Sequence, residues 1–139
     1  MTDVKSTTYA AQEAGKMALN TGIANVGLYA ISTTYEASAL AANDVIKLFE
    51  LPIGAVVYGM DVYFDDLGTG TTLDVGDSND VDRYIDGADT ATAAGAAHIT
   101  LADAIGYRIG TNAGDEVVTA KNLGASATGT IKVVCTFAL

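Results

Sequence analysis

The sequence predicts an all-β fold, a jelly-roll-like β-sandwich of about eight strands that occupies residues 25–139. Several segments alternate apolar and polar residues with a period of two, as strands with one buried face do. Short runs of Gly, Asn, Asp and Ser separate these segments, and such residues favour turns because they tolerate positive φ or bond their own backbone. Many short strands with regular turn signals favour a sandwich or barrel. The pattern does not fix the strand order.

Residues 1–24 differ in composition from the rest of the chain. They are rich in Ala, Thr and Gly and contain few bulky apolar residues. The stretch from Ala10 to Leu19 offers only about two or three helical turns, and Gly15 interrupts it. An isolated helix of this length is marginal in water. We therefore expect residues 1–24 to form a weakly ordered N-terminal arm.

Three segments carry the strongest strand pattern: 56–64, 105–110 and 131–139. In the last segment the alternation places Cys135 on the apolar face. In the first it places these residues on one face: Val56, Tyr58, Met60, Val62 and Phe64. Weaker patterns predict strands at 25–36, 44–51, 71–75, 82–86 and 115–120. Residues 88–98 show no period, which predicts a loop or a short helix.

Net charge excludes several classes of partner. Seventeen acidic residues against seven basic ones give a formal charge of −10 and a pI near 4.1. Such a surface repels phosphate backbones, so we expect neither nucleic acid nor membrane as a partner. No run approaches the roughly 18 apolar residues of a membrane span, and no apolar segment follows a basic one near the N-terminus, which argues against a secretory signal. We expect synthesis in the cytoplasm.

Eight of the acidic residues lie between Tyr63 and Asp89: Asp65, Asp66, Asp74, Asp77, Asp80, Asp82, Asp86 and Asp89. An EF-hand needs acidic or amide residues at positions one, three and five and a Gly at six. Counting from Asp77 places Val81 at position five, and counting from Asp80 places Tyr84 there. An irregular ion site within Asp74–Asp82, made of Asp74, Asp77, Asp80 and Asp82, stays open. The favoured interpretation is acidic turns that keep strand edges from pairing.

The residues for catalysis are few. His98 is the single histidine and Cys135 the single cysteine, so a triad would need Cys135 or a serine close to His98 in space. Burial of Cys135 would raise its thiol pKa, which disfavours a nucleophile. The run Gly68–Leu73 begins like a dinucleotide-binding glycine motif but lacks its last glycine. We predict no enzyme, no catalytic residue, no cofactor and no metal.

Three stretches resemble small capsid-associated proteins of tailed bacteriophages. They are Leu51-Pro52-x-Gly54-x-Val56 continuing to Val62, the run Thr72–Gly87, and Ala93-Ala94-Gly95. The resemblance covers about the middle third of the chain. The members of this family are head decoration or cement proteins built on a jelly roll. The resemblance therefore implies a head-stabilising structural protein of the virion.

The resemblance also implies partners and location. It implies a homotrimer on the capsid exterior that bridges subunits of the major capsid protein, with the arm laid across neighbouring subunits. Two alternatives stay open. One is a tail or fibre subunit of the virion. The other is a calcium- or carbohydrate-binding β-sandwich module, although the absence of Trp disfavours an aromatic sugar platform.

Overall fold

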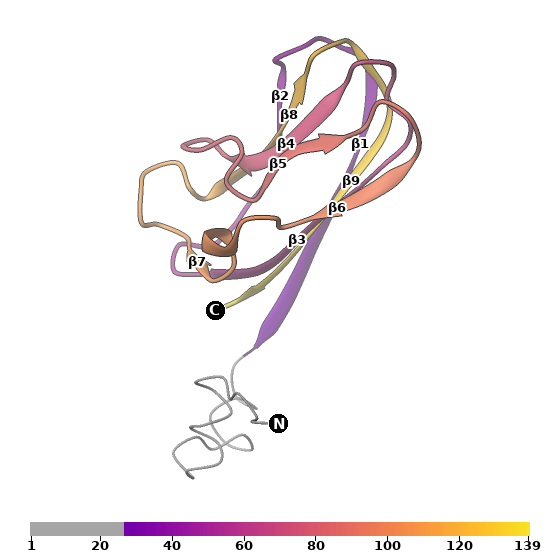
Figure 1. The fold of residues 1–139 in the computed structure, drawn as a ribbon. Coiled ribbons are helices and arrows are strands. Elements are labelled where there is room, and N and C mark those ends of the chain that lie inside the picture. Colours follow the sequence, from indigo (N-terminus) through magenta and orange to yellow (C-terminus); the bar gives the residue numbers. More distant parts are fainter. Residues whose placement is uncertain (1–26) are drawn as a thin grey trace, which may run out of the picture.

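Residues 27–139, the part of the chain that the computed structural model describes, form two antiparallel sheets packed as a sandwich (Figure 1). The all-β prediction is confirmed. The strands are β1 (Leu28–Leu40), β2 (Val45–Glu50), β3 (Val56–Phe64), β4 (Thr72–Asp77), β5 (Ile85–Asp89), β6 (Gly95–His98), β7 (Tyr107–Arg108), β8 (Val117–Leu123) and β9 (Ala127–Ala138). A 3₁₀ turn, η1 (Ala102–Ala104), precedes β7. The predicted arm, residues 1–24, lies outside the described residues.

The strand order is nested. The first sheet has the order β1-β9-β3-β6, with β7 also paired to β3, and the second has the order β2-β8-β4-β5. The outermost strands of the sequence therefore pair with each other, β1 with β9 and β2 with β8, and the inner strands pair in the same way, β3 with β6 and β4 with β5. This order makes the sandwich jelly-roll-like.

The nesting gives the sandwich two ends. At the proximal end β1 begins and β9 ends, beside the connections 51–55, 78–84, 99–106 and 109–116. At the distal end lie the connections 41–44, 65–71, 90–94 and 124–126. In Figure 1 the proximal end is at the bottom, where the C-terminus and β7 lie close to the start of β1.

The core lies between the sheets, and β9 contributes to it as the alternation predicts. Ile131, Val133 and Cys135 are fully buried, whereas Lys132 is exposed. Each buried methylene contributes roughly 0.8 kcal/mol through the hydrophobic effect. The period-two pattern therefore identified a central strand correctly, with Cys135 on the apolar face.

In β3 the predicted alternation is wrong for the first residues. Val57 is fully buried and Tyr58 is exposed, whereas Met60 and Val62 are buried as predicted. The pairing with β9 shifts register between Val57 and Gly59, which marks a bulge. A bulge adds one residue to the strand and exchanges the two faces on one side of it.

Three other predictions differ from the structure. Segment 105–110 holds only the two-residue β7, because Gly106 and Gly110 have φ of 86° and 99° and turn the chain on either side. Segment 88–98 is not simply a loop or helix, since 95–98 forms β6 against β3. Segment 82–86 becomes strand only from Ile85, the first residue of β5.

Candidate functional site

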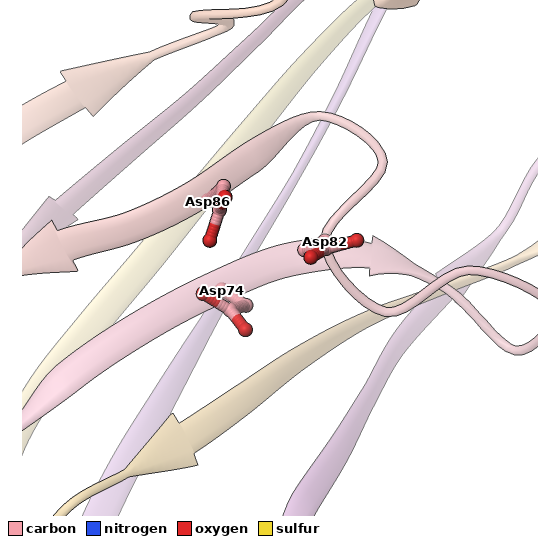
Figure 2. Close-up of side chains that lie close together, drawn as sticks. All are labelled: Asp74, Asp82 and Asp86. Carbon is pink, nitrogen blue, oxygen red and sulfur yellow. The ribbon is translucent and has the colours of Figure 1, made fainter.

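Three carboxylates of the acidic run converge in the second sheet. Asp74 lies on β4, Asp86 on β5 and Asp82 on the connection between them, and Figure 2 shows the three side chains close together. One carboxylate oxygen of each lies within 4.8 Å of the others. Asp74 is buried, Asp82 half-buried and Asp86 exposed. We call these residues the carboxylate triad.

Strand pairing and one glycine bring the triad together. Leu73 pairs with Ala88 and Val75 with Ile85, so Asp74 lies opposite the irregular step at 86–87. A Cβ on Gly76 would clash with the backbone carbonyl oxygen of Asp80. Only glycine therefore lets the 78–84 connection fold back over β4 and place Asp82 beside Asp74.

The electrostatics of the triad are dominated by burial and mutual repulsion. Burial raises the pKa of Asp74, and nearby Asp86 adds to the rise, whereas the Gly87 N–H and Lys121 oppose it. The Gly87 N–H donates to Asp74 Oδ1 at 2.7 Å, and Lys121 is the cross-strand partner of Asp74 on β8. For Asp82, a side-chain hydrogen bond with Asp80 raises the pKa most, followed by burial. Crowded carboxylates hold protons more tightly because one ionised group disfavours ionisation of the next.

This set of ligands is small for a calcium ion. Calcium takes six to eight oxygens, and three carboxylates supply at most six when all bind through both oxygens. One oxygen of Asp74 already accepts the Gly87 N–H. Of the four residues considered for an irregular ion site, the triad contains only Asp74 and Asp82. Asp86, which the sequence pattern did not select for that site, is brought in by the β4–β5 pairing.

Asp77 belongs to a different cluster, centred on Arg83. The Arg83 side chain donates to Asp77 and approaches Asp115 at 3.5 Å, and both carboxylates are fully buried. Asp77 also accepts the backbone N–H groups of Asn79 at 2.9 Å and Asp80 at 2.7 Å. We call Arg83, Asp77, Asp115 and Tyr107 the arginine cluster.

Tyr107 completes the arginine cluster. Its hydroxyl donates to Asp115 Oδ2 at 2.6 Å, and the Arg83 guanidinium lies 4.1 Å from the centre of its ring. The Asn112 N–H donates to the same Asp115 oxygen at 2.8 Å. Burial is the largest single influence on the Arg83 pKa and lowers it, but the hydrogen bond to Asp77 and the charges of Asp77, Tyr107 and Asp80 together outweigh burial, so the Arg83 pKa is raised. The cluster is a satisfied set of buried charges that ties the 78–84 connection to β7 and the 109–116 connection.

A surface cavity of about 410 Å³ opens between the arginine cluster and η1. Its wall includes Asp80, Asp82, Asp103, Leu101 and the outer side of Arg83 and Tyr107. The one cation in the wall is already bonded to Asp77. The cavity therefore offers carboxylates and a short apolar edge, without a nucleophile paired to a base.

The two residues considered for catalysis lie on opposite faces of the first sheet. Asp61 pairs with His98 on one side and with Val134 on the other, so His98 shares a face with Val134, whereas Cys135 points into the core. Burial raises the Cys135 pKa to about 12, in the predicted direction. A Cys-His arrangement is therefore excluded by geometry.

His98 does have a carboxylate partner. Its Nδ1 lies 2.6 Å from Asp61 Oδ1 on the exposed face. Ser32 lies in the same cross-strand row, because it pairs with Val134, and Val134 pairs with Asp61. Three strand spacings of about 4.8 Å separate Ser32 from His98, roughly 14 Å in all. Ser32 is too far from His98 for the triad that the sequence left open.

Comparison with known structures identifies the class of protein. No protein-family model matches the sequence, and no curated protein matches it. A chain of the cyanophage Pam1 capsid asymmetric unit superposes with a TM-score of 0.66 at 26% identity, over 83% of this chain and 85% of that chain. A chain of the capsid of Ralstonia phage GP4 gives a TM-score of 0.58 at 25% identity, over 81% and 83%.

These likenesses support a phage capsid-related structural protein. They cover more than four fifths of this chain, so they include most of the sandwich. Within residues 27–139, no helix is long and apolar enough to cross a membrane.

Proposed function

We propose that this protein is a capsid decoration protein. It binds the outer surface of a phage capsid as a trimer and stabilises the shell by bridging subunits of the major capsid protein. The observation that carries the proposal is the likeness of the sandwich to a chain of the Pam1 capsid asymmetric unit over 83% of its length. The GP4 capsid chain supports the same assignment.

The strand order agrees with this role. Four nested antiparallel pairs, divided between two sheets, support a jelly roll, an architecture that viral capsid domains use. We also propose that residues 1–24 are an arm and residues 25–139 the sandwich domain. The resemblance implies that such an arm lies across neighbouring capsid subunits.

The chemistry of the described residues fits a structural role better than a catalytic one. Arg83, the half-buried cation of the acidic region, is bonded to Asp77, the thiol of Cys135 is buried, and His98, which contacts Asp61, lies three strands away from Ser32. A bridging protein needs only modest contacts, because the second contact of a multivalent molecule is effectively intramolecular and can raise avidity by roughly 10²–10⁴.

Binding to shells tests the proposal directly. Purified protein is added to mature, expanded capsids of its own phage that lack it, and the pellet is assayed after sedimentation. We expect saturable binding at sites of local threefold symmetry, visible by cryo-electron microscopy, and a higher temperature of shell rupture. Unexpanded procapsids serve as the control surface. Absence of binding to expanded shells would contradict the function.

A tail or fibre subunit is the alternative within the virion. Immunogold labelling of intact particles separates the two by position. Labels confined to the tail would show a tail or fibre subunit and contradict the decoration role. Labels spread over the head would support the decoration role.

A further inference from the structure

The exposed large apolar side chains are concentrated at the proximal end of the sandwich. Tyr63 and Val45 are exposed towards the distal end, and Leu101 borders the cavity beside the arginine cluster. Tyr29 stacks on Phe137 on the core-facing side of β1. The remaining exposed large apolar residues among those described lie at the proximal end, and we call them the end patch: Leu28, Ile53, Tyr58, Ile105 and Leu139.

Strand register brings the end patch together from distant parts of the sequence. Leu28 pairs with Ala138, Ala138 with Val56, and Val56 with Arg108, which gives one row across four strands. Tyr58, on the β3 bulge, and Leu139, after Ala138, lie at this row. The Gly106 N–H donates to the carbonyl of Val57 at 2.7 Å and holds neighbouring Ile105 beside the start of β3.

The patch is unusual in how far its side chains extend into solvent. Leu28 is 65% exposed, Ile53 76% and Leu139 64%. Single exposed apolar residues are normal on protein surfaces, whereas a group of them gathered at one end of a domain is typical of an interaction surface. The β3 bulge contributes to the patch directly, because it turns Tyr58 outwards where unbroken alternation would let Val57 face solvent.

Charge indicates which protein covers the patch. With a formal charge of −10, copies of this chain repel one another over most of their surface. The side chains of the patch carry no charge, and the row that runs through them ends at Arg108. Copies can therefore approach here with the least repulsion and the largest apolar gain. Interfaces between identical subunits are also the more apolar class.

The order of events after folding also favours a second copy of this chain as the partner that covers the end patch. A decoration protein meets a shell only after the shell has formed, and an apolar patch left open until then would promote aggregation. A second copy of the chain is available as soon as the first has folded.

We propose that the end patch is the surface through which copies of this chain associate. The inference deepens the proposed function, on which it rests for the number of copies, three. It assigns the copy–copy contact to the proximal end and leaves the distal end, with Asp44, Asp65 and Asp66 in its connections, facing solvent. In Figure 1 the contact corresponds to the lower end of the first sheet.

Two matched double variants of the full chain test the contact. Leu28→Ser/Tyr58→Ser alters the end patch, and Val45→Ser/Tyr63→Ser makes nearly the same chemical change towards the distal end. Molar mass is measured by light scattering after size-exclusion chromatography over a dilution series. We expect the wild-type chain and the distal variant to be trimers, and the dissociation constant of the patch variant to rise tenfold or more.

Folding is checked separately by circular dichroism and by the denaturation midpoint. If the double variant fails to fold, Leu139→Ser repeats the test at the last residue of the chain, beyond the end of β9. A monomeric wild-type protein at tens of micromolar would overturn the inference, as would two folded double variants with unchanged mass.

Shell binding distinguishes this inference from the proposed function. A patch variant that keeps its trimer mass but loses affinity for expanded shells would show that the patch contacts the shell, and the inference would fall. A wild-type trimer that does not bind shells would contradict the decoration role and leave the copy–copy contact intact. A monomeric wild-type protein that binds shells would contradict the copy–copy contact and leave shell binding intact.

Discussion

The carboxylate triad and the arginine cluster come from the same acidic run, yet their charges are arranged in opposite ways. In the arginine cluster two fully buried carboxylates share one guanidinium and accept backbone or tyrosine donors. In the triad three carboxylates face one another, and Lys121 is the cross-strand neighbour of Asp74. The first arrangement contributes to the fold, whereas the second imposes a cost on it. Residue type and spacing alone do not distinguish the two.

The largest loss in the free energy of unfolding is expected when Arg83, the central cation of the arginine cluster, is replaced. In Arg83→Ala, Asp77 and Asp115 stay buried without their countercharge, and breaking one side of a buried ion pair costs roughly 3–5 kcal/mol. Urea denaturation at neutral pH measures the free energy of unfolding. Arg108→Ala is the matched control, because Arg108 is exposed and should change stability by less than about 0.5 kcal/mol. Equal losses in the two variants would contradict the structural role of the cluster.

A smaller loss in the free energy of unfolding is expected when Tyr107 is replaced. Tyr107→Phe keeps the ring that lies against Arg83 but removes the hydroxyl that donates to Asp115. A hydrogen bond to a charged group contributes roughly 1.5–3 kcal/mol, and we expect a loss near the lower bound because Asp115 keeps the Asn112 donor. Tyr63→Phe, whose ring is on the exposed face of β3, should be neutral. A neutral Tyr107→Phe would mean that the hydroxyl does not stabilise Asp115.

These two predictions concern residues that the sequence did not bring together. Asp115 is separated from Arg83 by 32 positions, and Tyr107 by 24, so only the strand order makes them neighbours. Asp86 was missed for a related reason, because its approach to Asp74 depends on the irregular β4–β5 pairing. Period-two alternation correctly gave β9 and the burial of Cys135, since a central strand has one face in the core along its length.

Alternation failed where local geometry interrupts it. The bulge at Tyr58 reverses the faces of β3, and Gly106 and Gly110 reduce a predicted strand to β7. β6 consists of Gly, Ala and His residues without a hydrophobic period, and its strand structure comes from pairing with β3. The acidic turns were only half correct. Asp65, Asp66, Asp80 and Asp82 lie in connections, whereas Asp74, Asp77, Asp86 and Asp89 lie in strands.

Neutralising a charge in the carboxylate triad should raise the free energy of unfolding, whereas neutralising Arg83 in the arginine cluster should lower it. Because burial raises the Asp74 pKa, the folded chain holds this proton to a higher pH than the unfolded chain, and stability falls as pH rises through the raised pKa. Asp74→Asn keeps an oxygen acceptor for Gly87 and should stabilise the protein at pH 7 by a few tenths to about 1 kcal/mol.

The gain from Asp74→Asn should shrink on acidification and vanish below the pKa of the unfolded carboxyl, about 3.9. Urea denaturation from pH 3.5 to 7.5 measures it. Asp44→Asn removes the same unit of net charge at an exposed turn and corrects for general repulsion. A loss of stability in Asp74→Asn at pH 7 would show that the attraction of Lys121 outweighs burial.

The smallest effect on the stability of the protein is expected from the addition or removal of calcium. A ligand present at a hundred times its dissociation constant adds about 2.7 kcal/mol to stability, so a real site would raise the melting temperature clearly. The triad provides few free oxygens, Asp74 already accepts the Gly87 N–H, and Lys121 is the cross-strand partner of Asp74. We therefore expect melting curves in 1 mM calcium and in EDTA to coincide within about 1 °C. A calcium-dependent rise that Asp86→Asn abolishes would change the meaning of the triad, because its repulsion would then serve to hold a cation.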